Sequence, residues 1–147
     1  MKKFKYNLES LLHLRGKKEV DLLQLYASQI RVRVESENKY KKELNRLEIV
    51  KDSINNMRSG QFKPADQSYY LSEILRLQKL IDNLLEDLNK KEKNEEIARK
   101  NYLNARAEKG ILEKLKERKR IHHFKEQTKL EQKLLDDIVS SSMTHKM

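Results

Sequence analysis

Residues that end helices or turn the backbone are almost confined to one short segment of this 147-residue chain. The chain has three glycines and one proline, and Gly60 and Pro64 lie together within residues 58–66. A sandwich, a barrel or a doubly wound sheet needs many more turns, so the sequence argues against all three. With 38% charged residues and no cysteine, the composition is typical of a long-helix protein rich in Leu, Lys, Glu and Arg.

A single turn in such a chain predicts an all-α fold, an antiparallel two-helix coiled-coil hairpin that forms one domain over residues 1–147. Helices of this length cannot bury themselves alone, so each needs a partner along its length. The expected elements are a first helix over about residues 8–57, a turn over 58–66, a second helix over about 67–139 and a flexible tail over 140–147.

The ends of these helices carry recognisable capping residues. Asn7 is expected to cap the first helix, and Gly60 to end it in the left-handed conformation. Pro64 can open the second helix, and Asp66 is expected to be its N-cap.

Apolar residues recur in both predicted helices at alternating steps of three and four, which is the pattern of a coiled-coil seam. In the second helix the frame runs through Ile74, Leu77, Ile81, Leu84, Leu88, Lys91, Glu95, Ala98, Tyr102, Ala105 and Leu112. In the first helix it runs through Leu23, Tyr26, Ile30, Arg33, Glu37, Tyr40, Leu44, Leu47, Lys51 and Ile54. Near the start, Phe4, Leu8, Leu11, Leu22, Leu25 and Val32 follow a frame shifted by one residue. Near the end, a shifted frame runs through Ile121, Phe124, Thr128, Glu131, Leu135 and Ile138.

Folding the hairpin about residue 62 places residues opposite each other when their numbers add to about 124. This rule sets apolar residues against apolar residues along the pair. The predicted levels are Leu44 with Leu80 and Ile81, Leu23 with Tyr102, Leu11 and Leu12 with Leu112, and Gly16 with Gly110.

The second helix is longer than the first, so its end beyond about Lys125 has no partner in the chain. It nevertheless carries Leu130, Leu134, Leu135 and Ile138 at helical spacing. We interpret this end as a partner-binding helix. A frayed terminus and a homodimer that covers the stripe are the alternatives.

The net charge of +10 predicts an acidic partner, and the densest basic segment is residues 114–125, the basic run. Its candidate binding residues are Lys114, Lys116, Arg118, Arg120 and Lys125. Nucleic acid is not the expected partner, because Phe124 is the only aromatic residue other than histidine there and a hairpin is not a parallel basic zipper. A solvated basic face is the simpler alternative, and an acidic protein surface is the preferred interpretation.

Motifs for catalysis are missing from the sequence. There is no phosphate-binding loop, and adjacent His122 and His123 point in different directions on a helix. We therefore expect no enzyme activity, no catalytic residue, no cofactor and no metal. No segment reaches the roughly 20 apolar residues of a membrane span, and the expected compartment is the cytoplasm.

Several segments match a known family. They are the opening with Phe4, Tyr6, Leu8, Leu11 and Leu12, the central glycine-containing turn, the segment from Tyr70 to Ile81, the run from Leu112 to Arg120, and residues 131–137. In these segments and in its layout the chain resembles the FliJ family, small coiled-coil components of the bacterial flagellar type III export apparatus.

The resemblance implies a role that the residues alone do not show. Proteins of this family form a stalk similar to the gamma subunit of rotary ATPases, and their terminal end binds and promotes the hexameric export ATPase FliI. They also contact the cytoplasmic domain of the export gate protein FlhA and act as chaperone escorts. This implies a non-enzymatic protein of flagellum assembly and motility, peripheral to the inner membrane at the flagellar base, with export chaperones as further partners.

Carried onto this sequence, the resemblance implies two binding surfaces. The ATPase-binding residues are Lys114, Lys116, Arg118, Arg120, Lys125, Leu134, Leu135 and Ile138. The gate-binding residues are Leu44, Leu77, Leu80 and Leu84. The stalk of another type III secretion system and a basic nucleic-acid-binding coiled coil are the alternatives that the sequence leaves open.

Overall fold

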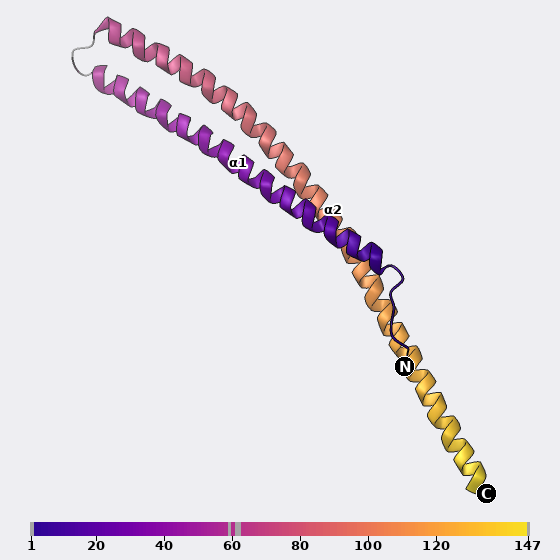
Figure 1. Cartoon of the computed structure of the whole chain (residues 1–147). Coiled ribbons are helices and arrows are strands. Elements are labelled where there is room, and N and C mark those ends of the chain that lie inside the picture. Colours follow the sequence, from indigo (N-terminus) through magenta and orange to yellow (C-terminus); the bar gives the residue numbers. More distant parts are fainter. Residues whose placement is uncertain (1, 59, 61–62, 147) are drawn as a thin grey trace. The chain divides into compact units, whose positions relative to one another are not determined.

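The computed structural model describes residues 2–58, 60 and 63–146, and within them it contains two long α-helices (Figure 1). Helix α1 spans Glu9–Arg58, with 50 residues, and helix α2 spans Pro64–Lys146, with 83 residues. The all-α coiled-coil hairpin predicted from the turn segment is confirmed. The chain divides into two compact units, Met1–Asp21 with Leu103–Met147 (the terminal unit) and Leu22–Tyr102 (the central unit). That the chain forms one domain stays a prediction.

The turn segment differs from the prediction in its capping residues. Helix α2 begins at Pro64, three residues before the expected start, and the carbonyl of Lys63 accepts hydrogen bonds from the backbone N–H groups of Asp66 (3.1 Å) and Gln67 (3.2 Å). Asp66 therefore lies in the first turn instead of at the N-cap, where its carboxylate still favours the positive end of the helix dipole. Gly60 donates to the Met57 carbonyl (3.1 Å) without a positive φ, so the predicted left-handed ending is wrong.

The other helix ends also differ from the prediction. The Leu8 carbonyl accepts the Leu12 N–H at 2.9 Å, while the Asn7 side chain accepts a hydrogen bond from Lys119 at 3.4 Å, so Asn7 is not the cap. At the carboxyl end, α2 continues through the predicted flexible tail to Lys146. Hydroxyl groups there are satisfied within the helix, as when Thr144 Oγ1 donates to the Ser140 carbonyl at 2.8 Å.

The core of the central unit follows the predicted frames closely. Leu47 of α1 packs with Leu77 and Ile81 of α2, and Leu77 is fully buried. The residues packed around this cluster are Tyr40, Leu44, Val50 and Ile74. Because Leu44 and Ile81 share this cluster, the predicted pairing of their levels is supported.

In the amino-terminal half of α1 several leucines of the expected frames do not face α2, whereas Tyr26 and Arg33 do. Leu23 and Leu25 are exposed, and Tyr26 stacks on Tyr102 with ring centroids 6.2 Å apart. In the terminal unit Leu11 is likewise at the exposed surface, whereas Leu12 is half-buried. The assignment of Leu11, Leu23 and Leu25 to the seam is therefore wrong. Since α1 carries leucines on more than one face here, periodicity could not choose between them.

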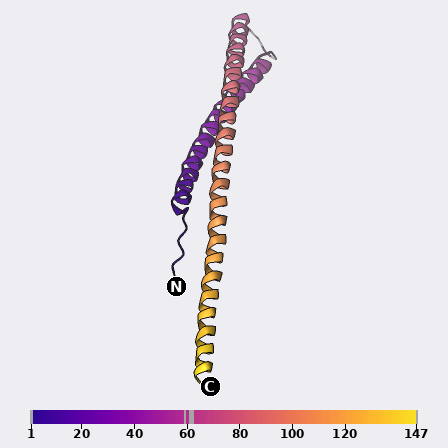
Figure 2. The same ribbon diagram turned by 90° about the vertical axis from the view of Figure 1, so that its right-hand side faces the viewer.

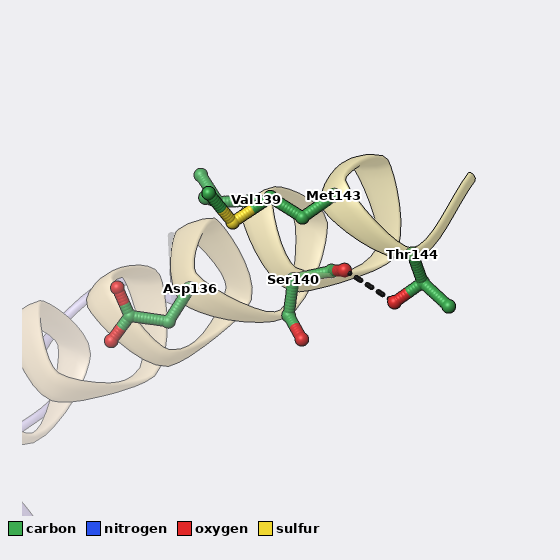
Figure 3. A pocket seen from close by; sticks show the side chains of 5 residues that line it. All are labelled: Asp136, Val139, Ser140, Met143 and Thr144. Atoms are coloured by element: carbon green, nitrogen blue, oxygen red, sulfur yellow. Dashed lines mark hydrogen bonds between the residues drawn. The ribbon is translucent and has the colours of Figure 1, made fainter. Parts of the chain in front are cut away.

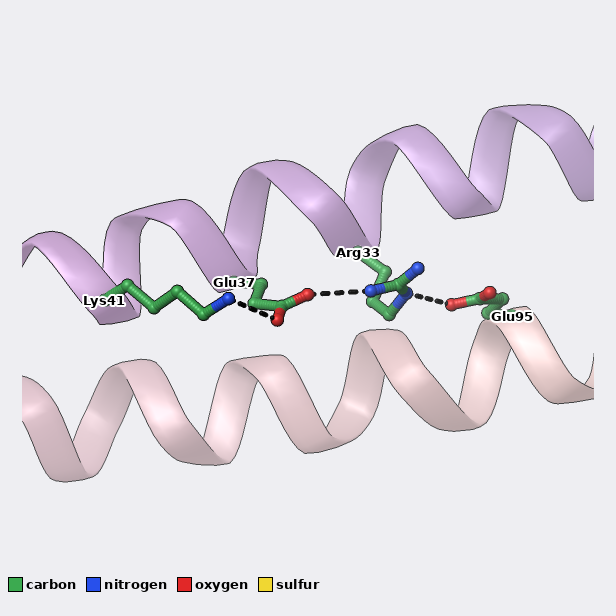
Figure 4. Close-up of polar contacts among 4 residues, drawn as sticks. All are labelled: Arg33, Glu37, Lys41 and Glu95. Atoms are coloured by element: carbon green, nitrogen blue, oxygen red, sulfur yellow. Dashed lines mark hydrogen bonds and ion pairs between the residues drawn. The ribbon is translucent and has the colours of Figure 1, made fainter.

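Polar residues in the central seam find partners across it. Arg33 of α1 pairs with Glu95 of α2 and with Glu37, which also binds Lys41 at 3.0 Å (Figure 4). The hydrogen bond that Arg33 donates to Glu95 is the main cause of a raised Arg33 pKa, and the hydrogen bond that Lys41 donates to Glu37 is the main cause of a lowered Glu37 pKa. Three of the charged seam positions, Arg33, Glu37 and Glu95, are thus joined by charge-assisted hydrogen bonds.

Acid should weaken the hairpin through Glu37. Its folded pKa lies below its ordinary value of 4.5, so its stabilising contribution is present above that value and is lost as the pH falls through the lowered pKa. We expect the melting temperature to fall between pH 5 and pH 3, roughly the range over which such carboxylates titrate. A Glu37→Gln variant, followed by circular dichroism, should melt lower at pH 7 and depend less on pH; an unchanged pH profile would contradict the assignment.

In the terminal unit the surroundings of the two helical glycines, Gly16 and Gly110, differ. Lys109 of α2 reaches Glu19 (3.3 Å) and Glu113 (3.5 Å), and its Cε would lie 3.7 Å from a Cβ added at Gly16. A Cβ at Gly110 would meet no atom within 4 Å. Gly16 therefore leaves room for the lysine stem, whereas Gly110 faces open space.

Alanine should fit at both glycines and strengthen the helices. The added Cβ meets only ordinary contact at Gly16 and none at Gly110, and alanine is preferred to glycine in a helix by up to about 1 kcal/mol. Gly16→Ala and Gly110→Ala should each raise the free energy of unfolding in urea by up to that amount. A loss of stability in either variant would show that the backbone there needs glycine.

Candidate partner-binding surface of the terminal unit

A short non-helical segment, Lys2–Asn7, runs from the start of α1 along α2 and is called the N-terminal strap below. Tyr6 is buried, and its hydroxyl donates a hydrogen bond to the Leu112 carbonyl at 3.2 Å. The Phe4 ring lies 5.6 Å from the His123 ring, and His123 Nε2 lies 2.9 Å from the Lys2 carbonyl oxygen. The strap thus covers α2 from Leu112 to His123.

An extended conformation explains how so few residues cover so much helix. From Tyr6 to Lys2 an extended chain spans about 13 Å at about 3.3 Å per residue. From Leu112 to His123 the helix rises about 16 Å at about 1.5 Å per residue. The strap was not predicted from the sequence, although Phe4, Tyr6 and Leu8 alternate with polar residues in the period-two pattern of an extended segment.

Beyond the strap, α2 continues without a partner in the described part of the chain. Both views show the helix running on past the N-terminus (Figures 1 and 2). Every residue from Thr128 to Thr144 is exposed, and Leu134, Leu135 and Ile138 keep 61%, 62% and 63% of their surface accessible. We call residues 126–144 the overhang. As predicted from the lengths of the two helices, its apolar side chains are not covered by any residue that the structure describes.

The last turns of the overhang form an open hollow on the helix surface. Asp136, Val139, Ser140, Met143 and Thr144 line it. In the close-up the Met143 side chain reaches back toward Val139, so the two make one apolar ridge, while Ser140 and Thr144 are joined by their hydrogen bond (Figure 3). An apolar ridge beside polar groups suits contact with another helix.

The basic run is only partly free for a partner. Lys116 forms an ion pair with Glu9 at 2.8 Å, and Arg120 pairs with Glu117 at 2.6 Å. The hydrogen bond between Arg120 and Glu117 raises the pKa of the arginine and lowers that of the carboxyl group. Lys119 was not among the predicted binding residues, and its Nζ atom lies 5.8 Å from the centre of the Tyr6 ring.

The remaining predicted cations are unpaired. Lys114, Arg118 and Lys125 are exposed and form no ion pair with any residue that the structure describes. These three cations precede the overhang along α2, and by helix geometry they lie within about 40° of one another around it.

The residues predicted to contact an export gate lie in and around the central core. Leu77 has no accessible surface, and Leu44 packs against its cluster. Leu80 and Leu84 are half-buried. Leu77 therefore cannot touch a partner while the hairpin is intact, because its surface is already used to join the two helices.

Within the residues that the structure describes, no group of three or more His, Asp or Glu residues could hold a metal ion. Neither described helix contains a stretch that is long and apolar enough to cross a membrane.

The fold and the surface define the class of protein, which is a coiled-coil hairpin with an N-terminal strap and an exposed carboxyl-terminal end of α2. The chain belongs to the FliJ family, since the family model described as flagellar FliJ protein matches residues 4–147. It is thus a component of the flagellar protein export apparatus, in a family of structural components that are not known as enzymes. No curated protein and no solved structure matches the chain.

Proposed function

We propose that this protein is the stalk that binds the hexameric export ATPase FliI through its terminal unit and promotes assembly of the ATPase ring. The observation that carries the proposal is the exposed apolar overhang next to the unpaired cations Lys114, Arg118 and Lys125. Apolar side chains supply binding energy where water is excluded, and the cations guide association with an acidic surface.

The finer roles follow from the family and rest on it. The stalk would link the ATPase to the cytoplasmic domain of the export gate protein FlhA, with a chaperone-escort role in flagellum assembly, at the cytoplasmic face of the inner membrane. For the gate, Leu80 and Leu84 are the candidates that keep accessible surface, and they lie on α2 in the central unit. Leu44 is a weaker candidate, because it already packs in the core.

Co-purification with the cognate export ATPase tests the proposal. We expect the protein to bind the ATPase, raise its hydrolysis rate and increase the fraction of hexameric rings seen by electron microscopy. A double variant, Arg118→Glu with Lys125→Glu, should weaken binding at low salt and flatten the loss of stimulation as salt is raised, because it reverses the attractive charges that salt screens.

A charge-matched control distinguishes the effect of these particular cations from the effect of the protein's net charge. Lys79 and Lys100 are exposed cations of the central unit with no ion pair among the described residues, so Lys79→Glu with Lys100→Glu should stimulate like the parent. Failure of the parent protein to bind or stimulate any secretion ATPase would refute the proposal. Equal loss in the two double variants would refute the assignment to the terminal unit.

A further inference from the structure

The second apolar stripe of the terminal unit has the spacing of a coiled-coil seam but no second helix. Its members, at steps of three and four, are Ile121, Phe124, Thr128, Glu131, Leu135 and Ile138. All six are exposed, and Phe124, Leu135 and Ile138 each keep more than half of their surface accessible. A seam of this kind is completed only by another helix.

The stripe borders the strap at Phe124, which lines an open hollow together with Lys2 and Phe4. Successive residues of a helix are about 100° apart, so Ile121 stands about 160° around the helix from His123, which contacts the strap. A second helix on the stripe would therefore lie beside the strap and cover this hollow, with Phe4 and Tyr6 in place on α2.

The stripe matches itself when two copies are laid antiparallel. One register sets Ile121 against the other copy's Ile138, and Phe124 against its Leu135. The same register sets Thr128 against the other copy's Glu131 on both sides of the twofold axis. The Thr128 hydroxyl already donates to the Phe124 carbonyl at 2.9 Å, so its methyl group is free to pack. A closed twofold pair of this kind uses the same surface on both copies.

Charge also favours the antiparallel pairing. In a parallel pair the basic runs of the two copies would lie side by side, and Glu131 of one copy would face Glu131 of the other. In the antiparallel register, Asp136 and Asp137 of one copy are level with His123 and His122 of the other. They then lie within about one helical turn of Arg120. Basic and acidic segments of α2 thus come together, which lowers the electrostatic cost of association.

We propose that two copies of this protein pair through an antiparallel coiled coil of residues 121–138, when no other partner covers the stripe. The overlap is short, about 27 Å at about 1.5 Å per residue, but both helices are already formed as continuations of α2. A small interface of preformed helices gives a weak, concentration-dependent dimer. The stripe shares Leu135 and Ile138 with the proposed ATPase contact, so the two partners would occupy it in turn, but each contact can exist without the other.

Sedimentation equilibrium of the purified full chain tests the pairing. We expect the mass to rise from 17.6 kDa toward twice that value as concentration increases into the micromolar range. Ile121→Glu and Phe124→Glu, each alone, should raise the dissociation constant about tenfold or more, since each sets a charge in the seam. Ile111→Glu is the matched control, because Ile111 is also an exposed isoleucine of α2, 67% accessible, but lies outside the stripe.

A monomer at every concentration would overturn the proposal and leave the stripe to a different partner. An unchanged dimer in both seam variants, or an equal loss in Ile111→Glu, would overturn it as well. Circular dichroism of each variant shows whether its helices are intact, and a variant that has lost helicity is replaced by Leu135→Gln, which keeps the helix and removes the apolar contact.

Engineered cysteines test the direction of pairing, and the natural chain contains none to interfere. When Ile121→Cys and Ile138→Cys chains are mixed and oxidised, the antiparallel register predicts a disulfide between the two different chains. Each variant alone should remain largely uncrosslinked. Disulfides within each variant alone, and none between the two, would show a parallel pair and overturn the register.

Discussion

Leu77→Ala is expected to be the most damaging single truncation in the protein, lowering the free energy of unfolding by about 2–5 kcal/mol. Leu77 is fully buried between α1 and α2, where Leu47 and Ile81 complete its cluster. Removing its side chain leaves a cavity at a seam only one side chain thick, so few neighbours can move in to fill it. Urea unfolding followed by circular dichroism measures the effect.

Leu75 supplies the matched control, two residues away on the same helix. It is 68% exposed, so Leu75→Ala should change the stability by no more than about 0.5 kcal/mol. Similar losses in both variants would show that the central core does not hold the hairpin together. The contrast also guides work on the export gate, because a defect in Leu77 variants would report loss of helix pairing and not loss of a contact residue.

Replacing Leu134, Leu135 and Ile138 together by Asp should abolish ATPase stimulation and motility while leaving melting nearly unchanged. All three side chains are exposed and contact nothing that holds the hairpin, so the stability should be preserved. Three carboxylates on the apolar face would be desolvated on binding a partner, at a high energetic cost. Swimming assays, ATPase rates and thermal melts measure the three quantities.

Two lysines on the opposite face of the overhang provide the control, with the same total change of charge. Lys129→Gln with Lys133→Glu in one chain should leave motility and stimulation intact, since both side chains are exposed and lie away from Leu134 and Ile138 around the helix. If the triple change on the apolar face collapses the melt, these leucines belong to a core and the overhang is not free. If both variants lose motility alike, charge and not the apolar face is responsible.

Much of the fold could be predicted because it depends on local chemistry. One segment with Gly60 and Pro64 in a chain of helix formers permits one turn, and the frame through Leu77, Ile81 and Leu88 allows one face of α2 to be buried. The difference in length between the two helices then leaves the end of α2 uncovered. Each of these steps needs only spacing and residue type.

The candidate surface was predictable only in part. The exposure of Leu134 and Ile138 follows from helix length, but the pairing of Lys116 with Glu9 depends on how two distant segments come level. Likewise, the position of Leu77 in the sequence does not tell a buried seam residue from an exposed partner-binding residue. Only its packing shows that its surface is already buried in the core.

The sequence by itself determined the two-helix fold, the place of the turn, the seam of α2 and the uncovered end, because these depend on period and length. The tertiary structure alone decided which leucines of α1 face inward, since Leu12 rather than Leu11 turns toward α2 and Tyr26 rather than Leu23 meets Tyr102. A helix with apolar residues on several faces settles its rotation only against its partner. The strap was decided in the same way, because an extended segment is stable only where Tyr6 finds the surface of α2.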